Sequence, residues 1–161
     1  MNSITFKFPT IPESVNNLYF SNRGRRVMST AGRKFKNSFV ATRGGLTAVD
    51  LMKFIADNDL VYELHLWFYL KPEHLYNLTY GKSKAVKSPY KDIDTSNLVK
   101  LAEDSISKLI GVRDRNNWTV CAHKRESPEG KDFMLAVLKP LNIQEDPYAF
   151  AGRPSQATTC D

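Results

Sequence analysis

Residues 61–70, with the sequence VYELHLWFYL, constrain the fold more than any other segment of the chain. Side chains of a β-strand point alternately to opposite faces of a sheet, and aromatic and branched residues favour strands. One face of this strand would carry Tyr62, Leu64, Leu66, Phe68 and Leu70. The segment therefore predicts a strand with one thoroughly buried face, which other elements must cover.

The remaining segments predict the element order β, α, β, α, β, β. Strands are expected at residues 3–8, 61–70, 117–124 and 132–138, and helices from Ser29 or Thr30 to about Thr42 and from Ser96 to Gly111. The last two strands are expected to pair antiparallel around residues 126–130. Residues 15–29 predict a short hairpin or ordered loop, and residues 47–56 a second short helical stretch.

Length and composition favour one domain. The chain has 161 residues, of which 42% are hydrophobic and 25% charged, enough for a single core. We expect an α+β fold in which helices pack on one mixed β-sheet. Residues 1–141 would form this domain, and the polar residues 142–161 a loosely ordered tail.

The net charge of +6 is unevenly distributed. Residues 14–49 contain seven basic residues and no acidic one, and the acid-free residues 74–91 contain four lysines. Such segregation is expected of a surface that binds a polyanion, because each neutralised phosphate releases counterions. The alternative for either stretch alone is a charged face that only keeps the protein in solution. The candidate DNA contacts are Arg23, Arg25, Arg26, Arg33, Lys34, Lys36, Lys82, Lys84, Lys87 and Lys124.

Several kinds of site are not expected. Cys121 and Cys160 lack a CxxC spacing, and the three histidines lack an HxxxH spacing, so a zinc site is not predicted. A glycine-rich phosphate loop and a nucleophile elbow are missing, so a nucleotide cofactor is not expected either. No apolar run suits a signal peptide or a membrane span, which favours a cytoplasmic protein without membrane contact.

Asp92 and Asp94 are the first candidates for catalysis. In an extended segment, residues two apart point the same way, so both carboxylates would converge. Two carboxylates about 4 Å apart repel by roughly 4 kcal/mol at an effective dielectric near 20, so a close pair favours a bound cation. Mg²⁺ prefers such oxygen ligands and, with Mn²⁺ as a substitute, is the expected ion. An Asp-x-Asp pair in a solvated loop is the simpler alternative.

Asp114 and Lys100 extend this candidate site. Asp114 follows the helix that ends at Gly111, and a third carboxylate at the same sheet end would complete a metal site. Lys100 would stabilise the charge that develops during cleavage of a phosphodiester. Its alternative is an ordinary helical ion pair with Asp104, four residues further along.

Together, three motifs resemble the RusA family of Holliday junction resolvases, over about residues 4–138. They are IPESVNNLYFSNRGRRVMSTAGRKFK, DIDTSNLVKLAEDSISKLIGV and RDRNNWTVCAHK, in that order along the chain. The resemblance implies a homodimer that binds four-way DNA junctions and makes paired, symmetric nicks with magnesium, in recombination and repair. It implies Asp94 and Asp114 as metal ligands and Lys100 as an essential lysine. The family's frequency in phages suggests a bacterial or phage-infected cell.

Two positions depart from the family pattern. Ser96 stands where the second aspartate of the family's Asp-x-Asp is usual, and Arg113 stands where the first of two adjacent aspartates is usual. The working hypothesis is magnesium-dependent hydrolysis of branched DNA at Asp92, Asp94 and Asp114. The main alternative is a basic protein that binds nucleic acid without cutting it. A third hypothesis is an interaction protein in which the aspartates are only helix-capping or solvated groups.

Overall fold

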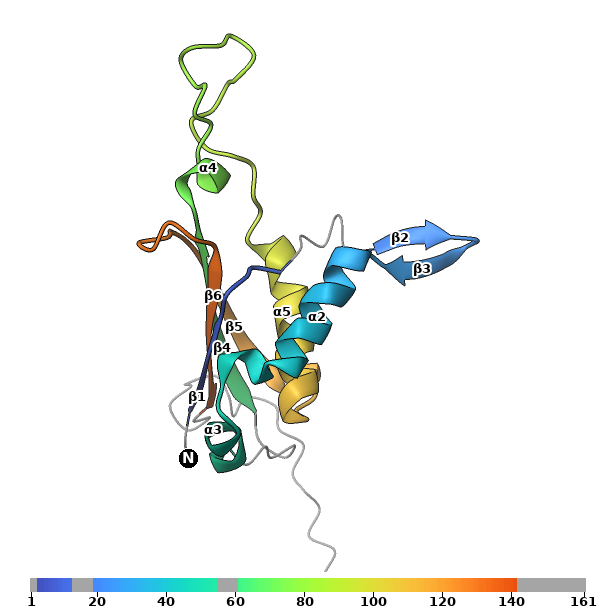
Figure 1. The fold of residues 1–161 in the computed structure, drawn as a ribbon. Helices are drawn as coiled ribbons and strands as arrows, with labels where there is room; N and C mark the ends of the chain where they lie inside the picture. Colours follow the sequence, from blue (N-terminus) through green and yellow to red (C-terminus); the bar gives the residue numbers. More distant parts are fainter. Residues whose placement is uncertain (1–2, 13–18, 55–60, 142–161) are drawn as a thin grey trace, which may run out of the picture.

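The computed structural model describes residues 3–12, 19–54 and 61–141. Within these ranges, the side chains of Arg26, Lys53, Asp114 and Trp118 are outside the description. The predicted tail, residues 142–161, also lies outside the described residues. The fold is α+β, as predicted, with helices packed on one mixed four-stranded sheet (Figure 1).

Strand β4 (Tyr62–Leu70) lies inside this sheet, and its alternation follows the prediction. Its five even-numbered side chains are buried, and the four between them are partly exposed. The strand order is β1-β6-β4-β5, in which β1 is Ile4–Phe8, β5 is Asn117–Glu126 and β6 is Phe133–Pro140. Strand β4 therefore has a hydrogen-bonded neighbour on each side.

The predicted pairing of the last two strands is wrong. Strands β5 and β6 lie on opposite sides of β4, which pairs with β5 in parallel and with β6 antiparallel. Helix α5 (Ser96–Ile110) connects β4 to β5, and a parallel neighbour reached through a helix is a usual crossover. The connection after β5 then crosses the end of β4, where Ser127 N donates to Leu70 O at 2.8 Å.

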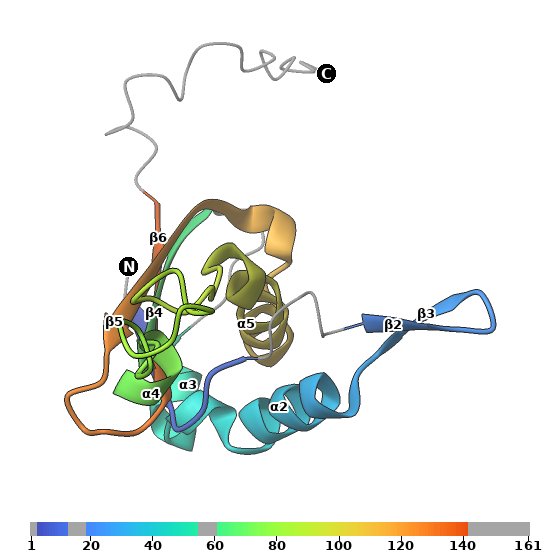
Figure 2. The ribbon, with the colours of Figure 1, turned by 90° about the horizontal axis from the view of Figure 1, so that it is seen from above.

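Helices α2 (Thr30–Ala41) and α5 cover one face of the sheet (Figures 1 and 2). Helix α2 begins where predicted, because the Ser29 hydroxyl accepts a hydrogen bond from Gly32 N at 3.0 Å. Phe35 and Phe39 of this helix pack their rings against Phe8. Full burial of one such side chain contributes about 2 kcal/mol, so this aromatic group helps to fix the helix on the sheet.

A glycine ends α5 as predicted, and two glycines lie in the turn that follows α2. The turn η1 (Arg43–Gly45) follows α2, and a Cβ added at Gly45 would lie 2.1 Å from Lys7 O. The short α3 (Ala48–Lys53) then begins with Thr47 as its cap. It ends at Lys53 and not at the predicted Ala56, because Phe54 is already extended. At the end of α5, Gly111 adopts a left-handed conformation with φ 75°.

Two basic projections leave this body in different directions (Figures 1 and 2). The first is the predicted hairpin, formed by β2 (Tyr19–Asn22) and β3 (Arg25–Met28), which we call the basic hairpin. The second, residues 76–91, is the basic loop, and the one-turn helix α4 (Pro72–Leu75) precedes it. Among the described helices, none has the length and apolar character needed to cross a membrane.

Candidate nucleic-acid interface and acidic site

Residues 91–95 join the basic loop to α5 and carry the first two candidate aspartates. Ile93 is partly buried and packs against the core, and its carbonyl accepts a hydrogen bond from Lys124 Nζ at 2.8 Å. Asp92 and Asp94 stand on either side of this anchor and are exposed. The segment is therefore held at its centre while both carboxylates remain accessible to solvent.

Asp94 interacts with the first residue of α5. Its Oδ1 accepts hydrogen bonds from Ser96 N at 2.9 Å and from Ser96 Oγ at 2.7 Å. The Ser96 hydroxyl, then the Ser96 backbone N–H and the charge of Lys124 lower the pKa of Asp94 below its ordinary value. Asp94 is thus ionised at neutral pH, where it also complements the positive end of the helix dipole. Ser96, the first residue of α5, therefore holds the Asp94 carboxylate in place.

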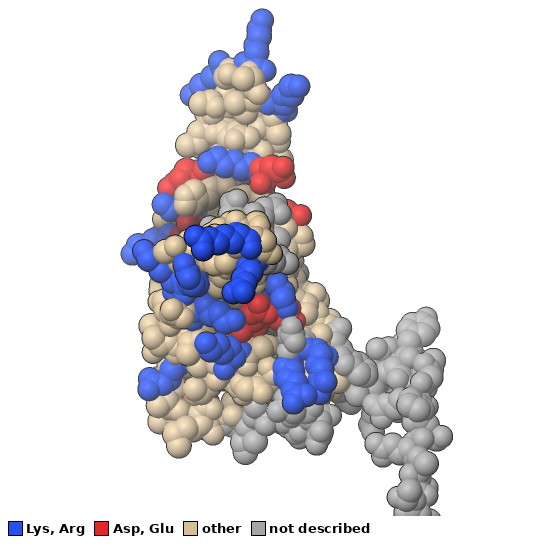
Figure 3. Space-filling model, turned by 90° about the vertical axis from the view of Figure 1, so that its right-hand side faces the viewer, with Lys and Arg blue, Asp and Glu red and all other residues tan. Residues whose placement is uncertain are grey.

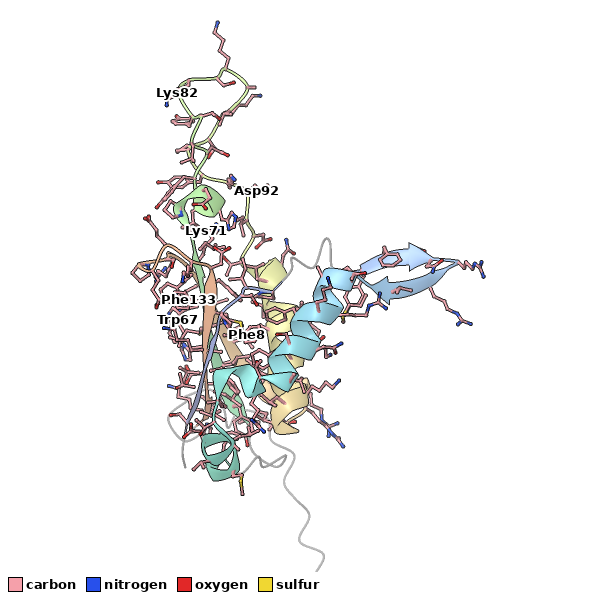
Figure 4. The ribbon with its side chains drawn as sticks, viewed as in Figure 1. Phe8, Trp67, Lys71, Lys82, Asp92 and Phe133 are labelled. Atoms are coloured by element: carbon pink, nitrogen blue, oxygen red, sulfur yellow. The ribbon has the colours of Figure 1, made fainter. Side chains whose placement is uncertain are left out.

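The three-carboxylate site stays a prediction. Asp92 lies near the base of the basic loop (Figure 4). Among the described side chains, Asp92 and Asp94 belong to no group of three potential metal ligands whose atoms lie within 4.8 Å of one another. The side chain of Asp114 is outside the description, but its backbone opens the turn η2 (Asp114–Asn116), which contacts α5. Asp114 therefore follows the C-terminal end of α5, whereas Asp94 precedes its N-terminal end.

Lys100 lies one turn into α5 and forms the ion pair that its spacing indicated. Lys100 Nζ is 2.9 Å from Asp104 Oδ1, and the lysine side chain is 45% exposed. On the same helix, Glu103 Oε1 accepts a hydrogen bond from Asn117 Nδ2 at 3.0 Å, which ties the start of β5 to α5. An exposed pair of this kind contributes only a few tenths of a kcal/mol to stability.

The basic hairpin presents arginines at its tip. Arg23 (φ 49°) and Gly24 (φ 76°) form the turn, and Arg25 begins the returning strand. Arg23 and Arg25 are exposed, whereas the side chain of Arg26 is outside the description. Phe20 is 50% exposed, because the hairpin extends away from the sheet. Its neighbour Tyr19 packs against the core.

The hairpin leads into α2, which adds to the positive surface. Arg33 and Lys34 are exposed on this helix, and Lys36 is partly buried. Figure 3, which views the molecule along the hairpin, shows Lys and Arg side chains grouped around a smaller acidic patch. This face of the described molecule therefore combines cationic and acidic groups.

Hydrogen bonds at its base hold the basic loop in place. Tyr76 and Tyr90 form an antiparallel bridge at its base. Asn77 Nδ2 donates to Ser88 O at 2.8 Å and to Tyr90 O at 2.9 Å, and Tyr76 Oη donates to Glu126 Oε2 at 2.8 Å. These contacts fix the loop to the end of β5. Its tip exposes three of the predicted DNA contacts, namely Lys82, Lys84 and Lys87.

Exposed aromatic rings accompany these lysines. Tyr80 is 49% exposed and Tyr90 is 65% exposed. Aromatic rings beside cationic groups can stack on unpaired bases while the cations contact phosphates. The basic loop therefore carries both kinds of group that bind single-stranded or branched nucleic acid.

Sequence reasoning missed two residues that position the site. The contact of Lys124 with DNA stays a prediction, and the structure shows in addition that its ammonium group donates a hydrogen bond to the Ile93 carbonyl, between the two aspartates. Asn77 was not singled out, although its amide closes the basic loop. Neither hydrogen-bonding role could be predicted from neighbouring residues. The partner of Lys124 is distant in sequence, and the partners of Asn77 lie on the far side of the loop.

We also compared the chain with known protein families and with curated proteins. The chain matches no protein-family model, and a search of the curated proteins returns no match.

Proposed function

We propose that this chain is a magnesium-dependent endonuclease that binds branched DNA, such as a four-way junction, in recombination or repair. One observation carries the proposal: an exposed acidic segment, residues 92–94, lies in the angle between the basic hairpin and the basic loop (Figures 1 and 4). A branched DNA offers two duplex arms at an angle, and each projection would hold one of them.

Charge explains how the projections would bind. The tips carry Arg23, Arg25, Lys82, Lys84 and Lys87, and the described tip residues include no acid. Cations on two separate projections would contact phosphates on two DNA arms and release their counterions. A straight duplex would engage one projection well and the other poorly, so the proposal includes a preference for junctions.

The acidic groups fit the proposed metal. Asp94 is exposed, ionised and fixed by Ser96, and carboxylate oxygens suit Mg²⁺. Asp92 and Asp94 would hold the ion, which would supply Lewis-acid polarisation of the phosphate and an activated water. Asp114 follows the other end of the 15-residue helix α5, so it would reach such an ion only across a dimer. Ile93, anchored by Lys124, would keep the two neighbouring carboxylates directed outward. Lys100 would stabilise the negative charge on the cleaved phosphate.

A homodimer belongs to the same proposal. A four-way junction has approximate two-fold symmetry, and a symmetric dimer would present two equivalent acidic segments to it. Paired nicks would then follow from the geometry of the assembly. The order of the three sequence motifs, which resembles the RusA family, supports this part of the proposal.

The test separates binding from cutting. We expect Asp94→Asn and Asp114→Asn each to slow nicking of a labelled four-way junction by about 100-fold or more, which corresponds to roughly 3 kcal/mol of transition-state stabilisation. Binding of the junction should change little. Asp50→Asn, an exposed acid at the start of α3, is the matched control and should nick normally. Undiminished nicking by Asp114→Asn would remove this mechanism.

A second candidate is a protein that binds branched DNA without cutting it. It is favoured by the hydrogen bonds of Asp94, because a carboxylate that accepts from Ser96 N at a helix start has a structural role of its own. In that case the wild-type chain binds junctions but leaves them intact with magnesium present. Asp94→Asn would then lower thermal stability and alter nothing else.

A further inference from the structure

The face of the sheet opposite α2 and α5 carries a second group of reactive side chains. The β4 residues between the buried ones point to this face, and none of the described helices packs on them. His65 pairs in register with Cys121 of the parallel neighbour β5, and Glu63 precedes His65 by two residues on the same face. The sheet thus places a carboxylate, an imidazole and a thiol side by side.

The three groups are close enough to share one ion. The carboxylate oxygen of Glu63, the ring nitrogen of His65 and the sulfur of Cys121 all lie within 4.8 Å of one another. His65 Nε2 is hydrogen-bonded to Glu63 Oε1. All three residues are partly buried, and the side chains of His65 and Glu63 are 23% and 19% exposed. An ion could therefore reach them from solvent.

The chemistry of the donors selects the kind of ion. Thiolate and imidazole suit zinc and other borderline or soft metals, whereas Mg²⁺ prefers oxygen alone. Zinc bonds are about 2.3 Å to sulfur and about 2.0 Å to nitrogen, so a tetrahedral ion holds its ligand atoms about 3.5 Å apart. The observed spacing needs only small side-chain adjustments to meet that geometry.

Neighbouring side chains already orient the ligands. Glu63 Oε2 is 2.9 Å from Lys139 Nζ, which leaves Oε1 directed toward His65. The His65 ring stacks on Trp67 with centroids 5.6 Å apart, and Trp67 stacks on His123 at 5.5 Å. Partners that fix ligand orientation commonly strengthen metal binding, because less freedom is lost when the ion binds.

We propose that Glu63, His65 and Cys121 bind one Zn²⁺ ion on the open face of the sheet, with a fourth position left for water or another ligand. This site is independent of the proposed nuclease site, since it lies on the opposite face from α5 and uses different donors. Its ligands come from two strands that are distant in sequence, so no local spacing could have predicted it.

Titration of the full-length, reduced chain with Co²⁺ tests the proposal. We expect one Co²⁺ per chain, a thiolate-to-cobalt charge-transfer band in the near ultraviolet, and displacement of that band by one equivalent of Zn²⁺. Cys121→Ser should abolish the band, and His65→Gln should weaken binding at least tenfold. Cys160→Ser is the matched control and should retain the band. A wild-type chain without the band, or a Cys121→Ser chain that keeps it, overturns the proposal.

A second measurement needs no variant and therefore does not depend on how the substitutions fold. Zn²⁺ should slow alkylation of Cys121 by iodoacetamide in the wild-type chain at least tenfold, followed by mass spectrometry of peptides. Alkylation of Cys160 in the same sample should be unaffected. Equal rates for Cys121 with and without Zn²⁺ would contradict the site.

Discussion

The basic hairpin and the basic loop are similar in charge but are held in different ways. Four backbone pairs, from Tyr19 with Met28 to Asn22 with Arg25, form the hairpin. The basic loop has one bridge, between Tyr76 and Tyr90, and depends on the side chain of Asn77 for two more hydrogen bonds. The hairpin should therefore tolerate side-chain changes that the loop does not.

This difference bears on function. A projection held by its own backbone ladder presents its arginines in a fixed direction, whereas one held at its base can move its tip as a unit. The hairpin also continues directly into α2, and the loop continues into the acidic segment before α5. If the proposed function holds, the hairpin would set the orientation of the DNA and the loop would couple binding to the acidic site.

The largest expected effect comes from the loop's lysines. Replacing Lys82, Lys84 and Lys87 with Gln should lower the slope of log K against log salt by up to about 2.7, and affinity by up to about 100-fold at 0.15 M salt. Fluorescence anisotropy on a labelled junction, at a series of salt concentrations, measures both. Lys7, Lys108 and Lys131, replaced together, remove the same charge elsewhere and should leave the slope nearly unchanged.

A smaller effect is expected from the hairpin tip. Arg23→Gln with Arg25→Gln should lower the same slope by up to about 1.8, since two phosphate contacts are lost instead of three. If the hairpin orients the DNA, this double variant should also shift the position of the nicks, as mapped on a sequencing gel. An unchanged slope would mean that the hairpin does not contact DNA.

The next change tests how the loop is held. Asn77→Ala removes two hydrogen bonds, each contributing about 1 kcal/mol, so backbone amides of residues 76–91 should exchange with deuterium faster. Junction affinity should fall a few-fold, because the loop must be ordered on binding. Asn22→Ala in the hairpin is the counterpart and should not change exchange there, since backbone pairs hold that turn. Equal effects in both variants would contradict the comparison.

A pH effect at the acidic segment is the smallest we expect. Ser96→Ala removes the hydroxyl that does most to lower the pKa of Asp94, so this pKa should rise toward its ordinary value. The contribution of Asp94 to stability is present above its unfolded-state pKa and is lost as the pH falls through the lower folded-state pKa. The Ser96→Ala variant should therefore lose less stability than the wild-type chain when the pH is lowered. NMR titration of the Asp94 carboxyl measures the change in its pKa. An unchanged pKa would mean that the hydroxyl is not its main determinant.

Local patterns predicted most elements of the fold but not their arrangement. The alternation in β4, the cap at Ser29 and the stop at Gly111 depend on neighbouring residues, and all three agree with the structure. The pairing of β5 and β6 could not be read locally. It depends on β4 occupying the position between them, which is decided by burial across the whole sheet.

The same distinction between local and long-range contacts applies to the candidate site. The Lys100–Asp104 pair followed from helical spacing, and the exposed arginines of the hairpin followed from its turn residues. The bond from Lys124 to Ile93 O, and the meeting of His65 with Cys121, arise from strand register and have no local signature. Contacts made within one element were predictable, and contacts made between elements required the structure.

Nicking of a labelled four-way junction by the wild-type chain, with Mg²⁺ or with EDTA, tests the central claim most directly. We predict nicks on opposite strands with Mg²⁺, none with EDTA, and far slower cutting of a straight duplex of the same length. Tight binding of the junction with no nicks under any of these conditions would contradict the claim and leave a protein that binds branched DNA without cutting it.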